Sequence, residues 1–183
     1  MVDERKKNQE ETRSEERKEF IDTVISINRV TKVTSGGKRF TFAAFVVSGK
    51  QAGSVGIGLG KGREASVAIA KATARARKSL VPYSIRENTL HFNVEGQHGA
   101  SEVVLRPASK GTGVIAGRAV RAVMVALGVT DVLSKSVGSR SGQNLVKATL
   151  NALARCRSLE RIARLRGKSM KQVIKGAHYV EAQ

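Results

Sequence analysis

Apolar and polar residues alternate with period two along three stretches in the first third of the chain, at 21–27, 40–46 and 55–59. This alternation is typical of half-buried strands, and turn signals rich in glycine separate the three stretches. Val30 and Val33 fall out of phase with the first stretch, which indicates a bulge or the end of that strand. We therefore predict three consecutive strands.

The third stretch carries only glycines on its second face, at positions 56, 58 and 60. Glycines weaken a strand but allow another backbone or a helix to approach closely. A helix is predicted next, over residues 63–80, which contain no Gly or Pro. Its expected inward positions are Ile69, Thr73, Ala76 and Leu80, and a second stripe is basic, with Lys71, Arg75 and Lys78. Pro82 then marks a boundary after a β-β-β-α unit.

The second unit mixes both periods. Strands are predicted at 90–95, 102–106 and 132–137, with a turn at 96–99 and a glycine-rich loop at 108–117. Helices are predicted at 118–127, ending at Gly128, and at 142–155. Ser158 and Ser169 are expected to cap two short helices. The domain prediction is a charged tail at 1–19, a first domain at 20–83, a second at 84–175 and a tail at 176–183.

Charge narrows the choice of partner. The 183 residues carry a formal net charge of +18, with 33 Lys and Arg against 15 Asp and Glu. The first 20 residues have six basic and seven acidic side chains, so the remaining body has a net charge of +19. A body this basic favours a polyanion, with nucleic acid first and an anionic membrane surface second.

A cytoplasmic protein of a reducing compartment is expected. Cys156 is the only cysteine, so no internal disulfide can form. The charged N-terminus has no apolar signal core, and no apolar run approaches the roughly 18 residues of a membrane span. The basic segment 155–171 has few large apolar residues, which makes membrane binding a weak alternative.

Two glycine-rich segments suggest phosphate chemistry. Gly56–Arg63 leads from a strand into a helix and, with Lys61 and Arg63, suits a phosphate oxygen; a tight turn with solvated charges is the alternative. Gly111–Ala116 matches GxGxxG/A, with Asp131 20 residues beyond Gly111. That match is the basis of an alternative function, a nucleotide-binding enzyme. The context argues against it, because Asp131 precedes the next strand instead of ending it.

Other chemistry finds little support. Phe40 and Phe42 have the spacing of an RNA-stacking strand, but that motif's Gly and Val are missing, so we expect both rings in the core. The histidines at 91, 98 and 178 and Cys156 show no metal-ligand spacing. We predict no catalytic residue, no metal and no cofactor.

Four sequence motifs are more specific evidence of a protein family than the composition is. They are Ile27-Asn-Arg-Val30 followed by Gly36-Gly37, Val55-Gly-Ile-Gly-Leu-Gly-Lys-Gly-Arg-Glu64, Arg106-Pro-Ala-Ser-Lys-Gly-Thr-Gly-Val-Ile-Ala-Gly117, and Arg166-Gly-Lys-Ser169. In order and spacing the chain resembles the bacterial small-subunit ribosomal proteins of family five, over roughly residues 18–175.

The resemblance implies an α+β fold. Its first part is a β-β-β-α domain like a truncated double-stranded-RNA-binding domain, which agrees with the strand and helix pattern. Its second part is a C-terminal α/β domain with a left-handed β-α-β crossover, which the usual right-handed rule would miss.

The resemblance also implies a place on the back of the small subunit, near the hinge between body and head. The implied partners are small-subunit rRNA and ribosomal proteins four and eight, close to the channel through which mRNA enters. A role in decoding accuracy through protein four follows, with no membrane and no homo-oligomer. The loop 31–37 would approach the hinge region where spectinomycin acts, and drug sensitivity stays open.

Carried onto this chain, the resemblance and the basic pattern give two groups of candidate residues. The candidates for rRNA contact are Arg29, Lys32, Lys38, Arg39, Lys61, Arg63, Lys71 and Arg75. The candidates for contact with RNA or with protein four are Lys110, Gly111, Gly113, Arg118 and Arg121. Cations and close glycines would hold RNA by its phosphates and shape rather than by its sequence.

Overall fold

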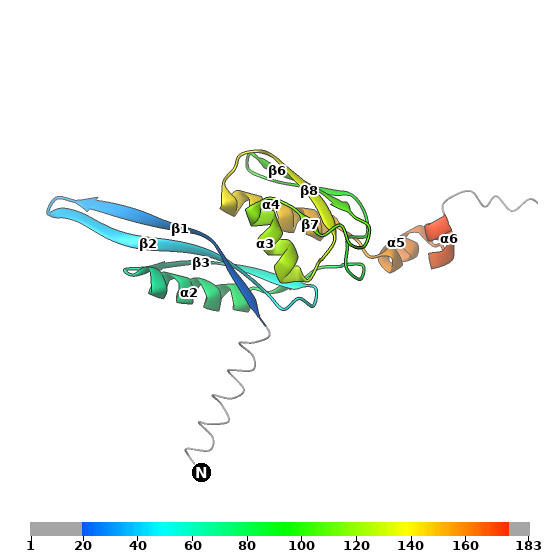
Figure 1. Cartoon of the computed structure of the whole chain (residues 1–183), viewed down its shortest axis with the longest axis horizontal. Helices are drawn as coiled ribbons and strands as arrows, with labels where there is room; N and C mark the ends of the chain where they lie inside the picture. Colours follow the sequence, from blue (N-terminus) through cyan, green and yellow to red (C-terminus); the bar gives the residue numbers. More distant parts are fainter. Residues whose placement is uncertain (1–19, 176–183) are drawn as a thin grey trace, which may run out of the picture.

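The computed structural model describes residues 20–175, so the predictions for the tails at 1–19 and 176–183 lie outside the described residues. Figure 1 shows two sheets with their helices and a pair of short helices that projects beyond the second sheet. The first unit contains β1 (Ile21–Thr34), β2 (Gly37–Gly49), β3 (Ser54–Gly62), α2 (Ala65–Lys78) and β4 (Val81–Pro82). The second contains β5 (Val94–His98), β6 (Ser101–Pro107), β7 (Val114–Ile115), α3 (Arg118–Leu127), β8 (Val132–Gly138), α4 (Gly142–Arg155), α5 (Leu159–Arg166) and α6 (Met170–Lys175).

The fold is α+β, as predicted. The first sheet is antiparallel with strand order β1-β2-β3-β4. The second has the order β5-β6-β8-β7, and only its β7–β8 pair is parallel. A β-α-β connection therefore runs from β7 through α3 to β8, and its left-handedness stays a prediction.

The glycines of β3 accommodate α2, as the sequence predicted. A Cβ atom built on Gly56, Gly58 or Gly60 would lie 2.0–2.2 Å from a carbonyl oxygen of α2. The α2 residues that face them are buried alanines, at positions 68, 72 and 76. The predicted inward stripe was therefore partly wrong: Ile69 and Thr73 are only half-buried, because the glycine face admits nothing larger than alanine.

One hydrophobic core joins the two units. It combines residues of the first sheet with residues of α3, α4, β6 and β8; the first-sheet members are Ile25, Phe45, Val47 and Val55. The other face of the same sheet packs on α2 through Ala44 and Val46. The first sheet is thus buried on both faces near its base.

The β2–β3 turn binds the end of α3 directly. The last carbonyls of a helix have no partner within the helix. Here the Gln51 N–H donates to Ala126 O at 3.1 Å, and the Gly53 N–H donates to Leu127 O at 3.0 Å. Gly128 ends α3 in the left-handed conformation, with φ of 93°, as predicted.

The distal half of the β1–β2 hairpin, residues 27–40, extends beyond the sheet and is called the finger below (Figure 1). Every finger residue is exposed, including Val33 at 69%. The bulge lies between Val24 and Ser26, and β1 continues to Thr34. The prediction of a bulge or strand end near Val30 was therefore wrong, since an unpacked hairpin needs no constant apolar face.

Two boundaries in the second unit also differ from the prediction. Residues 90–93 form no strand: the chain bends at 91–92, and the preceding turn is bonded to the residues just before β8, where the Thr130 and Asp131 N–H groups both donate to Asn88 O. Gly96 lies inside β5 rather than in a turn, and its missing side chain admits α4, with Ala148 O 2.3 Å from the Cβ position. The two-residue strand β7 was not predicted.

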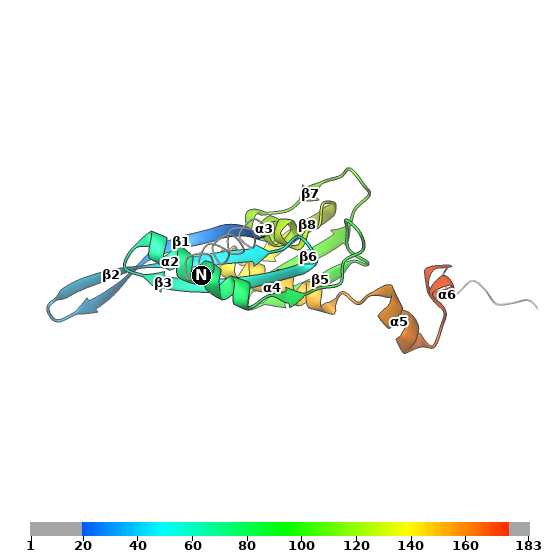
Figure 2. The same ribbon diagram turned by 90° about the horizontal axis from the view of Figure 1, so that it is seen from below.

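The C-terminal helices begin where the sequence placed them. Ser158 Oγ accepts from the Arg161 N–H at 3.3 Å, and Ser169 Oγ accepts from the Gln172 N–H at 3.4 Å. Both helices lie beyond α4, away from the sheets (Figures 1 and 2). Among the described helices, none is both long enough and apolar enough to span a membrane.

Candidate nucleic-acid interface

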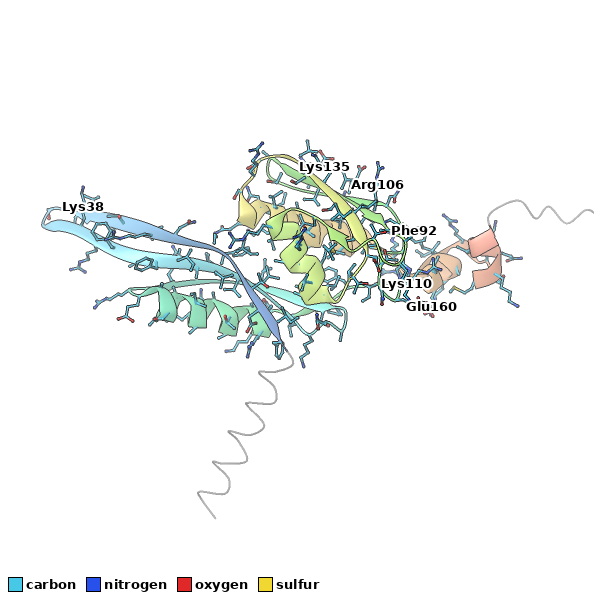
Figure 3. The ribbon with its side chains drawn as sticks, viewed as in Figure 1. Lys38, Phe92, Arg106, Lys110, Lys135 and Glu160 are labelled. Carbon is cyan, nitrogen blue, oxygen red and sulfur yellow. The ribbon has the colours of Figure 1, made fainter. Side chains whose placement is uncertain are left out.

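The finger carries four of the predicted cations. Arg29, Lys32, Lys38 and Arg39 are all exposed, and Lys38 lies at the far end of the molecule (Figure 3). Lys32 and Arg39 are direct cross-strand partners. Like charges in such a pair oppose each other, and the sequence has no acidic residue between Asp22 and Glu64 to offset them. The finger therefore presents an uncompensated positive charge at its tip.

Phe40 lies on this surface and not in the core, so the core prediction for it was wrong. Its side chain is 46% exposed, and the Arg29 guanidinium carbon stacks 3.8 Å from the ring centroid. A cation over an aromatic face is held in place while its N–H donors stay free at the edge. Phe42 packs against the α2-side core, as predicted.

The predicted cations at β3 and α2 are exposed but not equivalent. Lys61, Arg63 and Lys71 are exposed. Arg75 donates from Nη1 to Leu59 O at 2.6 Å, and Ser79 Oγ donates to Ile57 O at 2.8 Å. Part of the Arg75 guanidinium is therefore used to bind a backbone carbonyl of β3. The helical spacing alone did not indicate this contact.

The glycine-rich loop of the second unit already holds an anion of the chain itself. Asp131 Oδ1 accepts from the Gly113 N–H at 2.9 Å and the Gly111 N–H at 3.0 Å, and Oδ2 accepts from Thr130 Oγ1 at 2.9 Å. The bond from Gly113, followed by that from Thr130, lowers the pKa of the Asp131 carboxyl below its usual value. A phosphate has no access to these two N–H donors, so the dinucleotide-binding interpretation is wrong.

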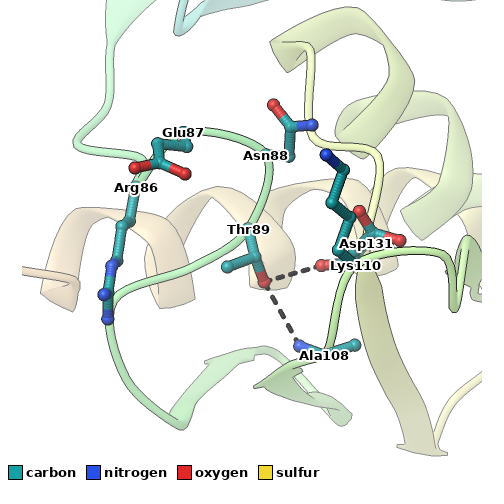
Figure 4. Close-up of a pocket in the computed structure, with 7 residues that line it drawn as sticks. All are labelled: Arg86, Glu87, Asn88, Thr89, Ala108, Lys110 and Asp131. Carbon is teal, nitrogen blue, oxygen red and sulfur yellow. Dashed lines mark hydrogen bonds between the residues drawn. The ribbon is translucent and has the colours of Figure 1, made fainter.

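A cavity of about 250 Å³ lies beside this loop and is lined by Arg86, Glu87, Asn88, Thr89, Ala108, Lys110 and Asp131 (Figure 4). Thr89 Oγ1 donates to Asp131 O at 2.7 Å and accepts from the Ala108 N–H at 3.2 Å. The bond to Ala108 fixes the backbone before Lys110, and the bond from the Gly111 N–H to Asp131 fixes it after Lys110, which is exposed at the rim. The lining mixes both signs of charge, which does not select an anion.

Arg118 and Arg121 are exposed on α3 and reach neighbouring backbone. Arg118 Nη2 donates to Val24 O at 3.5 Å, and Arg121 Nη2 donates to Val114 O at 3.3 Å. Lys110, Gly111, Arg118 and Arg121 are exposed on the loop 109–117 and the first turn of α3, a surface called the border below. Gly111 and Gly113 can contribute surface there but not free N–H donors.

The predicted rRNA-contact residues do not include one basic surface. Segment 155–171 has seven cations and one acid, and six of the cations lie on or next to α5 and α6. The charge of this segment is evident in the sequence, but its residues are not among the predicted rRNA contacts. No group of three or more His, Cys, Asp and Glu within residues 20–175 is arranged to hold a metal.

Comparisons with known proteins show which family models and relatives the chain resembles. Residues 20–83 match the family model described as "Ribosomal protein S5, N-terminal domain", and residues 96–166 match "Ribosomal protein S5, C-terminal domain". The chain is 49% identical over 149 residues to the "Small ribosomal subunit protein uS5" of Lawsonia intracellularis, covering 81% of this chain and 91% of that one. It is 50% identical over 163 residues to the protein of the same name from Granulibacter bethesdensis, covering 88% and 86%.

Proposed function

The chain belongs to the ribosomal protein S5 family, whose members are structural components of the small ribosomal subunit and not enzymes, and on that premise we propose how it holds the subunit's RNA. The first unit binds small-subunit rRNA through the finger and the exposed cations of β3 and α2. The residues proposed for this contact are Arg29, Lys32, Lys38, Arg39, Lys61, Arg63, Lys71 and Arg75.

The observation that carries the proposal is the finger. A two-stranded ribbon without a packed face is marginal on its own in water. Its exposed residues include Val33 and Phe40 as well as four cations, and Lys32 faces Arg39 across the strands. Phosphates on both sides would neutralise the repulsion and supply the missing contacts.

Protein contacts are proposed for the border formed by the 109–117 loop and α3. The residues are Lys110, Gly111, Gly113, Arg118 and Arg121, and the proposed partner is ribosomal protein four, with protein eight as a second neighbour. This border is rigid, because Asp131 ties the loop and Arg121 ties β7. A rigid interface between two proteins near the path of mRNA would influence decoding accuracy and the arrangement of head and body.

The test is cosedimentation with small subunits and binding to full-length small-subunit rRNA across a salt series. K32Q/R39Q should weaken rRNA binding and reduce the slope of log affinity against log salt by up to about 0.9 for each phosphate that is no longer neutralised. R106Q/K135Q is the matched control, since both cations lie on the second sheet (Figure 3), whose strands β5 and β6 also carry the exposed acids Glu95 and Glu102. Recovery of the native chain only in the soluble pool, away from small subunits, would refute the proposal.

A further inference from the structure

α5 and α6 project from the rest of the molecule. Residues 157–171, which include α5 and the beginning of α6, are called the arm below. The two helices contact each other, and Ala163 is the only described residue of α5 or α6 that is buried. The arm begins after Arg155, whose Nη1 donates to Glu95 O at 3.0 Å and so belongs to the body. The finger and the arm lie at opposite ends of the molecule's long axis (Figure 1).

The arm has a concentrated positive charge. Its cations are Arg157, Arg161, Arg164, Arg166, Lys168 and Lys171, all exposed, against one acid, Glu160. None of these six forms an ion pair with a carboxylate of the part of the chain that the structure describes. Arg161 and Arg164 are spaced i, i+3 on α5, a spacing at which like charges destabilise a helix.

The arm's stability points to an external anion. α5 and α6, to which the arm belongs, have eight and six residues, and helices this short are marginal without tertiary packing. The body supplies little of that packing, because α5 and α6 have no extensive contact with the elements before them. A bound polyanion would reduce the repulsion between the arm's cations and stabilise both helices.

We propose that the arm is a second RNA-docking surface, which binds rRNA phosphates at a site separate from the finger. Four of the six cations are arginines, whose forked donors match phosphate oxygens. Only Leu165 and Met170 are exposed large apolar residues in the arm, which is a small area for a protein interface or for membrane insertion. RNA is therefore the occupant that the charge favours.

The proposal rests on the proposed function and extends it. A chain with RNA sites at both ends of its long axis can link two RNA segments that are far apart (Figure 1). The second contact then forms at the effective concentration set by the first, so the chain would act as a clamp and not as a single-site binder.

The experiment compares R161Q/R164Q/R166Q with the charge-matched control R106Q/K135Q/R140Q, using full-length small-subunit rRNA and filter binding between about 50 and 200 mM salt. The arm variant should reduce the salt slope by about 2–3, and the control by less than about 1. R161K/R164K/R166K keeps the charge and should restore most of the slope. Circular dichroism should show the same main unfolding transition in all variants, because the arm lies outside the core.

K32Q/R39Q, measured in parallel, separates the two proposals. If the finger variant has a reduced slope and the arm variant binds like the wild type, the arm proposal is overturned while the rRNA function stands. An unchanged rRNA slope together with absence of the arm variant from small subunits would identify a protein as the arm's partner, which also overturns it. If neither variant reduces the slope, both proposals fail.

Discussion

Replacing Gly58 with alanine should be among the most destabilising single changes in this chain. A Cβ atom at this position would lie 2.0 Å from Ala72 O and 2.6 Å from Ala76 N, both backbone atoms of α2. Ordinary contact begins near 3.4 Å, so α2 would have to withdraw by about 1.4 Å. Backbone atoms cannot rotate away as a side chain can, so the strain falls on the whole helix.

Overpacking of a well-packed core typically costs about 1–3 kcal/mol, and this site belongs at the upper end or beyond it. Gly62 gives an intermediate case, because its nearest contact would be Ala68 N at 2.9 Å. Gly36 is the control, since a Cβ there meets nothing within 4 Å, and its substitution should stay within about 0.5 kcal/mol.

The assay is urea unfolding of the full-length chain followed by circular dichroism. The expected order of destabilisation is Gly58→Ala, then Gly62→Ala, then Gly36→Ala. If Gly58→Ala does not fold at all, it is still the most destabilised of the three variants, as expected. The reasoning is refuted if the free energy of unfolding of Gly58→Ala lies within about 0.5 kcal/mol of the Gly36→Ala value.

Three further predictions follow from the site and the core. Phe40→Leu should weaken rRNA binding several-fold because the Arg29 stack is removed, and Phe40→Trp should retain it; equal binding by both would contradict a role for the ring. Because the Gly113 N–H bond lowers the pKa of Asp131, its carboxylate stabilises the fold fully above the unfolded pKa of about 3.9, and this contribution disappears as pH falls through the lower folded value. Asp131→Asn should therefore flatten stability against pH in that range, as read from urea midpoints, and an unchanged pH profile would count against it. The body of the full-length chain, up to Cys156, should unfold in one calorimetric transition, whereas a 1–83 fragment should expose the core face of its sheet and bind a hydrophobic dye; two resolved transitions of the body would show independent cores.

Sequence periodicity succeeded where local packing decides the structure. Helix α4 begins and ends at the predicted residues 142 and 155, because a long apolar repeat has few alternatives. The glycine face of β3 predicted the close approach of a helix, since only a backbone needs that space. The inward face of that helix was predicted from its largest residues, although only small ones fit there.

Contacts between distant residues could not be predicted in this way. Phe40 has the alternation of a core strand, but its hairpin extends past everything that could cover it. Gly111 and Gly113 look like an open anion site until Asp131, from another strand end, occupies their N–H groups. The sequence could therefore indicate which types of residue form the candidate site. Which of their side chains are exposed, and which of their N–H groups are already bonded within the chain, depends on the fold.

The bond between the β2–β3 turn and the end of α3 imposes an order on folding during synthesis. Gln51 and Gly53 leave the site of synthesis well before Ala126 and Leu127, their partners in α3. At about 5–20 residues per second, the 74 residues from 54 to 127 take about 4–15 seconds to add. During that interval Phe45 and Val47 lack the α3 residues that bury them in the shared core. Chaperones that recognise apolar strands therefore have a defined period in which to meet this chain, and it closes when α3 arrives.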